Sequence, residues 1–377
     1  MEVRKKIDMR SYILVFALAA IWIVFEVLTK GTFLEARNLS TLFRQTASIA
    51  IIAVGMVLLI VAGHIDLSVG SIVAFTGAVS AIMQSVMGVN TALSIIVPIA
   101  VGVIFAAWNG YWASYQKIPP FIVTLASMQL FRSLTLIITN NQTISGMKPS
   151  FLTIGQGYLS KLSGYIISVA GVALFVFLIS KSRVDKQKKN IAVSSMQSHI
   201  LKMALIAVLV MVFTYIMNQY KGIPVPVIIM IVAAILIAFV SMKTRFGRRL
   251  YAIGGNPEAA KLSGINLNKE VMRIYMLVGA LSAVSGLILT ARLDAATTNA
   301  GISFEFSAIS AAVIGGTSFM GGEGTVFGAI VGSLIMASLT TGMSLLNVSS
   351  NVQGIFTGIV LLIAVWFDIL ARKKGRD

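Results

Sequence analysis

Long apolar runs separated by short polar segments dominate this chain and limit what it can fold into. Of its 377 residues, 57% are hydrophobic and 11% are charged, against about 25% charged residues in an average soluble domain. A helix needs about 20 apolar residues to cross a bilayer, and in lipid only helices and closed barrels satisfy their own backbone groups. The pattern predicts an all-α, polytopic integral membrane protein, with residues 1–377 forming a single transmembrane domain.

Twelve apolar runs are candidates for membrane-spanning helices. They are residues 12–28, 46–63, 69–87, 92–115, 121–139, 165–181, 199–217, 225–241, 272–291, 306–319, 324–343 and 352–370. Several are short for an upright crossing. The pairs 46–63 with 69–87 and 306–319 with 324–343 are interpreted as broken or re-entrant helices. We therefore expect ten to twelve crossings and prefer ten.

The excess of basic residues predicts how the chain lies in the membrane. It has 30 Lys and Arg against 13 Asp and Glu, a formal charge of +17. In a soluble protein such a charge suggests nucleic acid, but in a membrane protein basic residues mark cytoplasmic loops. With the N-terminus inside, most of them fall on the inner side. We expect a multi-pass cell-membrane protein with both termini cytoplasmic and no nucleic-acid partner. The basic start, 1–10, precedes a run too long for a signal peptide and is read as leading into a retained helix.

The stretch from Gly63 to Ser71 lies between two apolar runs, at the depth expected for the bilayer. A charged side chain there is costly unless it faces protein or water, so Asp66 is a functional hypothesis by default. Asp66 can cap a helix that starts near Leu67, with help from Ser68. It can equally be a hydrogen-bonding or gating group in a solute path, and the two roles can coexist.

A weak internal repeat relates this stretch to the segment around Gly324. Small residues recur at a spacing of four in both segments, at Gly70, Ala74 and Ala78 and at Gly324, Gly328 and Gly332. Such ladders let helices approach closely, and corresponding glycine-interrupted segments in two halves of a chain point to a central site. The residues expected at the path or its hinge are Asp66, Ser68, Gly70, Gly315, Gly316 and Gly324.

The polar segment 243–273 carries the signals of a short helix. Asn256 suits an N-cap and Pro257 the first helical position. Glu258 in the first turn complements the helix dipole, and Gly264 suits the C-terminal end. The pattern predicts a helix of about two turns lying along the cytoplasmic face. A solvated connector is the alternative, but a capped helix flanked by basic residues favours a docking element.

Several kinds of chemistry are missing from the sequence. The chain has no Cys and only 2 His, so a thiol nucleophile is excluded and a metal site is not expected. It contains no G-x-x-x-x-G-K-[ST] motif, so it does not bind ATP as a P-loop protein. We assign no catalytic residue, no metal ligand and no cofactor to this chain, and expect its energy to come from a partner or an ion gradient.

Several motifs are similar to those of one transporter family. Glu258-Ala259-Ala260 followed by Gly264 resembles the coupling loop of ABC-transporter permeases. Four other stretches resemble the monosaccharide branch of those permeases, which transports ribose, xylose and galactose: 65–71, 121–125, 246–256 and 312–318. The similarity runs across nearly the whole chain, and within the branch it is greatest to D-xylose permeases.

The resemblance implies a division of labour among several proteins. Two copies of the permease would form the path, a cytoplasmic ATPase would bind ATP and Mg²⁺, and an extracytoplasmic sugar-binding protein would deliver a monosaccharide, D-xylose or a related pentose. The permease itself would not be an enzyme. The residues implied in coupling to the ATPase are Asn256, Pro257, Glu258, Ala259, Ala260 and Gly264.

Some features stay open. An ion-gradient-driven secondary sugar transporter also fits broken repeats with a buried acid, although it gives the capped helix no purpose. The loops 140–164 and 292–305 are either docking surfaces for the binding protein or simply solvated. Arg132 lies inside an apolar run without an evident partner, and the segment 181–199 matches no familiar pattern.

Overall fold

The protein is almost entirely helical. The computed structural model describes residues 9–189, 193 and 195–373, so the basic residues expected at the two ends, 1–8 and 374–377, lie outside the described part. The strands found in the described part are β1 (Ile144–Ser145) and β2 (Ala295–Ala296), which pair antiparallel with Ile144 opposite Ala296. The predicted all-α membrane architecture is confirmed.

Ten helices in the described part are long and apolar enough to cross a bilayer, which matches the preferred count. They are α2 (Ala36–Val61), α3 (Val69–Ala81, extended by the π-helical turn η1, Ile82–Val86), α4 (Leu93–Ser114), α5 (Pro120–Ile138), α7 (Lys161–Lys188), α8 (Met196–Asn218), α9 (Val225–Lys243), α12 (Leu267–Leu293), α14 (Val326–Leu345) and α15 (Ser350–Lys373). The remaining helices are α1 (Met9–Leu28), α6 (Pro149–Gln156), α10 (Arg245–Gly255), α11 (Pro257–Leu262) and α13 (Phe304–Ile314).

Both predicted breaks are present, but they differ in form. The first separates two helices of full crossing length, because α2 ends at Val61 and α3 begins at Val69. The second lies between α13 and α14, and α13 has only 11 residues. At 1.5 Å of rise per residue α13 is about half as long as the bilayer is thick. An irregular segment, 297–303, precedes α13 and supplies the remaining length of this crossing.

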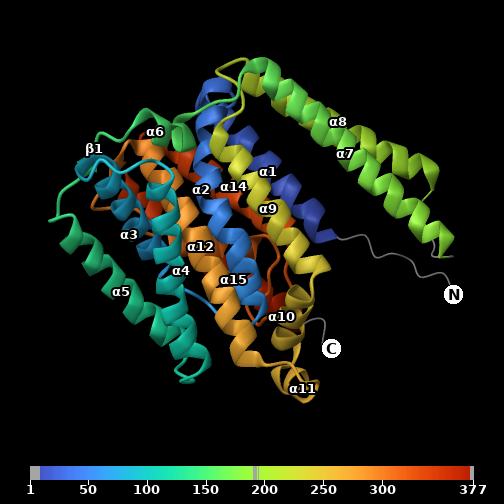
Figure 1. Cartoon of the computed structure of the whole chain (residues 1–377). Helices are drawn as coiled ribbons and strands as arrows, with labels where there is room; N and C mark the ends of the chain where they lie inside the picture. The colour runs from blue at the N-terminus through green and yellow to red at the C-terminus, as the bar shows by residue number, and fades with distance from the viewer. Residues whose placement is uncertain (1–8, 190–192, 194, 374–377) are drawn as a thin grey trace.

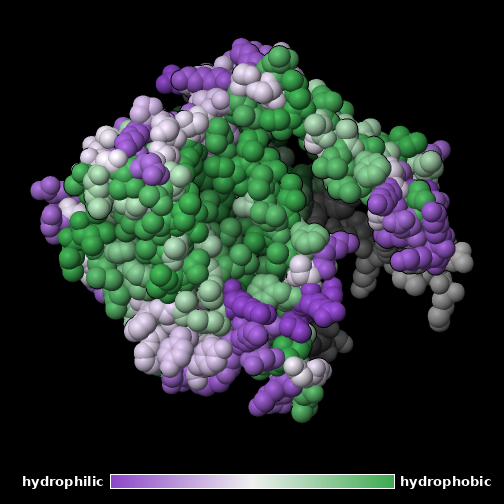
Figure 2. All heavy atoms as spheres, in the orientation of Figure 1, coloured by the Kyte–Doolittle hydropathy of each residue, from purple (hydrophilic) through white to green (hydrophobic). Residues whose placement is uncertain are grey.

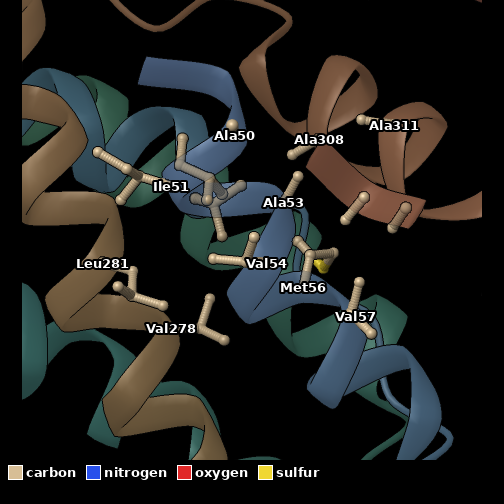
Figure 3. Close-up of a cluster of buried hydrophobic side chains, with 14 of the residues drawn as sticks. Ala50, Ile51, Ala53, Val54, Met56, Val57, Val278, Leu281, Ala308 and Ala311 are labelled. Atoms are coloured by element: carbon tan, nitrogen blue, oxygen red, sulfur yellow. The ribbon is translucent and has the colours of Figure 1, made fainter. Parts of the chain in front are cut away.

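The core is built around α2 and α12, which Figure 1 shows running side by side through the middle of the molecule. In their most apolar windows, 83% of the α2 residues and 78% of the α12 residues are buried. Figure 3 shows one face of α2 against Val278 and Leu281 of α12 and another against Ala308 and Ala311 of α13. The small residues on α2 and α13, such as Ala53 and Ala308, let these two helices approach closely.

The helices leave two polar ends. One carries α6 and the β1–β2 pair, and the other carries α10 and α11 (Figure 1); we call them the α6 side and the α11 side. Figure 2 shows a hydrophobic surface between hydrophilic patches at these ends, as expected for a membrane protein. The hairpin of α7 and α8 stands apart, since only 11% of its most apolar windows is buried.

Candidate functional site

Asp66 is buried in the break between α2 and α3 and binds Ser68, the N-cap residue of α3. Its Oδ1 accepts hydrogen bonds from the backbone N–H and the hydroxyl of Ser68, both at 2.7 Å. Asn109 of α4 donates its Nδ2 to Asp66 Oδ2 at 3.3 Å and to Ser68 Oγ at 2.7 Å. All three side chains have no exposed surface. The N-cap of α3 is Ser68, without a capping hydrogen bond from a side chain, and Asp66 accepts from that residue and not from an N–H inside the helix. The expected N-cap role of Asp66 is therefore wrong, and Asn109 is a partner that the sequence did not indicate.

Other buried polar atoms lie close to this network. Asn109 Oδ1, His64 Nδ1 and the Tyr275 hydroxyl are buried without a hydrogen-bond partner among the described protein atoms. The rings of His64 and Tyr275 meet edge to face at 5.8 Å. Buried polar groups are usually paired with protein or ordered water. This part of the core therefore keeps hydrogen-bonding capacity that no described protein atom uses.

The first turn of α3 meets the irregular segment before α13. A Cβ on Gly70 would collide with the backbone carbonyl of Gly301 and the carboxylate of Glu305, and a Cβ on Gly301 would collide with the carbonyl of Gly70. Gly301 also has φ +68, a conformation that glycine adopts at little cost. Two glycines 231 positions apart thus bring the first turn of α3 and the irregular segment before α13 into backbone contact. We call this contact, with Asp66, Ser68 and Asn109, the central junction.

Arg132 of α5 also binds the irregular segment that takes part in the central junction. Its Nη1 donates to the carbonyl oxygens of Ala300 at 2.8 Å and Thr298 at 3.4 Å. Its charge also interacts with that of Glu305. These are the partners that could not be named from the sequence. Backbone carbonyls in an irregular segment have no helix or sheet partner, and the bilayer core offers no water. The guanidinium therefore binds oxygens that would otherwise be unpaired.

Glu305 lies elsewhere than the sequence suggested. The sequence placed it in an outer loop, 292–305, that was either a docking surface or simply solvated, but only 7% of its surface is exposed and it belongs to the first turn of α13. It is therefore unavailable to a docking protein. The end of the segment 292–305 turns into the molecule, where Ala300, Gly301 and Glu305 are buried, while Leu293 and Ile302 stay exposed.

The other predicted hinge glycines lie where α13 meets α14. Gly315 packs on the backbone of Gly328, and Gly332 packs on the carbonyl of Ala311. The expected small-residue ladder on α14 is therefore a close helix contact. Gly316 begins the connecting loop with φ +87 and has open space around it. Gly324 closes the loop against Thr317 and Val61.

The short helix α11 has the predicted caps. The side chain of Asn256 accepts from the backbone N–H of Ala259 at 3.0 Å, and Pro257 occupies the first turn together with Glu258. At the other end Ile265 donates its backbone N–H to the Ala260 carbonyl at 3.1 Å. Gly264 makes this turn with φ +80, which other residues adopt only with strain. The predicted helix and its ends are confirmed, with six residues in regular helix.

This helix is an exposed knob. Of its six residues only Ala260 is buried, and Glu258 lies in contact with solvent. Leu262 is 89% exposed, which is unusual for a leucine outside the bilayer. Together with the exposed Glu258, it gives α11 a free outer face. The sequence did not single out Leu262, although its place at the end of the capped helix was a signal.

Helix α10 joins this knob to the core. A Cβ on Gly254 would collide with the carbonyl of Val61, the last residue of α2. That same carbonyl accepts the backbone N–H of Gly322, at 2.9 Å, from the loop between α13 and α14. The hydroxyl of Tyr251 donates to the carbonyl of Gly324 at 2.7 Å. Helix α10 thus contacts the ends of both breaks, and we call this contact the α10 junction.

An ion cluster also holds α10 against α12. Arg249 Nη1 contacts Glu270 Oε1 at 2.6 Å, and Arg273 Nη1 contacts Glu270 Oε2 at 3.3 Å. Glu270 is buried whereas both arginines are partly exposed. A buried carboxylate held by two guanidiniums fixes geometry more than it adds stability. In the described part of the chain, no group of three or more His, Asp or Glu residues is placed to hold a metal ion.

Comparison with known proteins places the chain among transport proteins. The profile of a family described as branched-chain amino acid transport system, permease component, matches residues 38–365. The chain belongs to this family. Its relatives include the xylose transport system permease protein XylH of Haemophilus influenzae, 45% identical over 370 residues that cover 98% of this permease and 99% of the relative. No solved structure matches the permease.

Further relatives carry two different sugar names. XylH of Escherichia coli K12 is 41% identical, with 98% of the permease and 94% of the relative aligned. The ribose import permease protein RbsC of Bacillus subtilis is 37% identical, with 94% and 91% aligned. These proteins are membrane components of transport systems, so the resemblance seen in the motifs is confirmed. The family description names amino acids and these relatives name sugars, so the family alone does not specify the substrate.

Proposed function

We propose that the permease is the membrane-spanning subunit of an ABC importer that carries D-xylose or a related pentose. The observation that carries this proposal is its similarity to XylH along the whole length of both chains, at 45% identity, against 37% for the ribose permease. Similarity of this extent includes the central junction as well as the surfaces at both ends. A permease of this kind performs no chemical step on the sugar, and we assign it no cofactor of its own.

The proposal assigns the α11 side to the cytoplasm and the α6 side to the outside. An ATPase that binds ATP and Mg²⁺ docks on α11, through Glu258 and Leu262. A sugar-binding protein docks on the α6 side, and a second copy of the permease completes the path. Exposed basic residues around α10 and α11 support this orientation, since Lys243, Arg245, Arg248, Lys261 and Lys269 gather there.

In the proposed mechanism the knob transmits movement of the ATPase into the core. Because Gly254 touches the Val61 carbonyl and the Gly322 N–H binds the same carbonyl, α10 cannot shift without displacing both loops. The first loop leads to Asp66, which binds Ser68, and to Gly70, and Gly70 touches the segment before α13. Displacement of α10 therefore changes both broken crossings together, which is what alternation between outward and inward access requires.

The decisive experiment is uptake of radiolabelled sugar in a strain that lacks this permease and retains its ATPase and binding protein. The permease should restore xylose uptake, with ribose and galactose as comparators. Glu258→Lys, or replacement of Gly264 by a bulky residue, should abolish uptake while membrane insertion stays normal. Restoration of ribose or galactose uptake alone would reassign the substrate, and normal uptake in both variants would remove the coupling role from α11.

An ion-gradient-driven transporter is the competing function. It predicts that the purified permease alone moves sugar into liposomes when a proton or sodium gradient is imposed. We expect no such uptake, because α11 has no role in that mechanism and its exposed Leu262 would have no protein to bind. The same liposomes should take up sugar when the ATPase, ATP and the binding protein are supplied.

A further inference from the structure

The α7–α8 hairpin touches the rest of the molecule mainly near the α6 side. Phe213 near the end of α8 meets Phe43 of α2 at 4.9 Å between ring centroids. The chain before α7 and after α8 is tied down by backbone hydrogen bonds between Leu159 and Ile223 and between Val225 and Gly157, both at 2.9 Å. Toward the α11 side the hairpin diverges from the core (Figure 1).

A basic cavity lies where the hairpin has diverged. It has a volume of about 310 Å³ and is lined by Leu178, Lys181, Ser182, Asp185, Lys186 and Lys189 of the α7 end and by Lys243 of α9. Four positive charges therefore face one negative charge. All four lysines are exposed. In Figure 2 the hydrophilic colour gathers at this end of the hairpin and again around α10 and α11.

The length of α7 sets the depth of this cavity. The helix has 28 residues, about 42 Å at 1.5 Å per residue, whereas the hydrocarbon core is about 30 Å thick. Figure 1 shows α7 inclined to the core helices, and an inclined helix uses more of its length to cross. The last two turns of α7, from Lys181 onward, therefore lie at the level of the lipid headgroups on the α11 side.

The faces of α7 and α9 one helical turn before the lysines, toward the bilayer core, are apolar. Leu174 is one helical turn before Leu178 and shares its face of α7, and both are more than half exposed. On α9, Phe239 is one turn before Lys243 and is 60% exposed. Cationic groups at headgroup level with apolar side chains directly beneath them match the two ends of a phospholipid.

We propose that the cavity between α7 and α9 binds one anionic phospholipid of the leaflet on the α11 side. The headgroup phosphate sits among Lys181, Lys186, Lys189 and Lys243, and the acyl chains follow the faces that carry Leu174 and Phe239. Basic pockets between transmembrane helices are a known form of headgroup site. The bound lipid fills the space between hairpin and core and holds α7 at a fixed distance from α9. The proposal is independent of which solute the permease carries.

The test is titration of dioleoylphosphatidylglycerol into the purified permease in an uncharged detergent, with bound lipid counted by native mass spectrometry. Phosphatidylcholine is the uncharged comparator. Each lysine at the headgroup is worth about fivefold in affinity, the equivalent of about 1 kcal/mol. The double variant Lys181→Gln with Lys186→Gln should therefore bind phosphatidylglycerol about 25-fold more weakly, and 0.5 M salt should weaken the wild type in the same direction.

The matched control is Lys188→Gln with Lys202→Gln, which removes two charges from the same hairpin outside the cavity. It should bind phosphatidylglycerol within about twofold of the wild type, and both double variants should elute with it on size exclusion. Equal loss in the two double variants would mean general charge attraction, and equal binding of the two lipids would mean no headgroup recognition; either overturns the proposal. A lower dimer fraction in the cavity variant with unchanged lipid binding would reassign this face to a subunit contact.

Discussion

The central junction and the α11 knob both lie between long helices. The first is held by contacts between residues far apart in the chain, and the second by contacts between neighbours. The central junction depends on residues far apart in the chain, with Gly70 against Gly301 and Arg132 on the Ala300 carbonyl. The knob depends on neighbours, since Asn256 caps a helix that begins at the next residue. Substitutions should therefore unfold the first region and leave the second folded but disconnected from its partner.

The largest expected effect is on the central junction, from Gly70→Val. Its side chain has no room beside the Glu305 carboxylate and the Gly301 carbonyl, and the carbonyl belongs to the backbone. Overpacking of this kind usually costs about 1–3 kcal/mol, and more where backbone must move. We expect little monodisperse protein by fluorescence size exclusion and a melting temperature lower by several degrees.

Gly358→Val on α15 is the matched control for Gly70→Val. That glycine is exposed and has open space where a Cβ would be built, so the same change should leave yield and melting temperature near those of the wild type. Equal behaviour of the two variants would show that the contact between Gly70 and Gly301 does not constrain the fold.

The second largest effect is on the knob, from Glu258→Lys. The side chain is exposed, and losing its interaction with the helix dipole costs only about 0.3–1 kcal/mol. Yield and melting temperature should stay normal. Sugar uptake should fall by more than about 100-fold, and the ATPase should no longer co-purify. Glu258→Gln, which keeps the shape, should retain part of both. A melting temperature reduced as far as in Gly70→Val would show that the knob is part of the core after all.

A smaller effect decides between the two roles of Asp66. Loss of a hydrogen bond costs about 0.5–1.5 kcal/mol, and residues in one hydrogen-bond network couple by about 0.5–3 kcal/mol. Asp66→Ala, Asn109→Ala and the double variant should therefore form a cycle with a coupling of about 1 kcal/mol in the free energy of unfolding. Uptake should fall only as far as stability does. A raised KM for sugar with unchanged stability would instead assign Asp66 to the solute path.

The knob could be predicted from the sequence because each of its signals is local. The Asn256 cap reaches three residues, and Gly264 ends the helix by its own φ. Hydrophobic runs of crossing length are likewise local, so the number of long helices followed from the sequence. The ends of these helices were predicted less accurately, since the apolar run 165–181 belongs to a helix that extends to Lys188.

The central junction could be predicted only in part. Asp66 and Gly70 were recognised as unusual, because a charge and a break stand out in an apolar sequence. Their partners Asn109, Gly301 and Glu305 were not, because nothing in a single chain states which distant residue a glycine touches. Glu305 was assigned to the surface for the same reason. Hydropathy marks where a chain leaves a helix but not whether the next segment stays outside or turns back.

The smallest expected effect lies between the two regions, in Tyr251→Phe at the α10 junction. The change removes the hydroxyl that donates to the Gly324 carbonyl at 2.7 Å and contacts Ser241 at 3.1 Å. Leaving that carbonyl unpaired costs about 1 kcal/mol or a little more, too little to unfold the protein. If α10 carries movement into the α13–α14 loop, ATP hydrolysis should continue and sugar transported per ATP should fall by about twofold to fivefold.

Tyr220→Phe is the control for this change, since Tyr220 lies at the far end of the molecule beside Tyr158. Proteoliposomes that contain the ATPase and the binding protein allow both rates to be measured on the same sample. An unchanged ratio in Tyr251→Phe would leave the contact of Gly254 with Val61 as the connection between knob and core. A fall in hydrolysis together with uptake would mean that Tyr251 supports docking of the ATPase. Only a fall in the ratio alone assigns the hydroxyl to transmission, because it separates the movement from the binding that drives it.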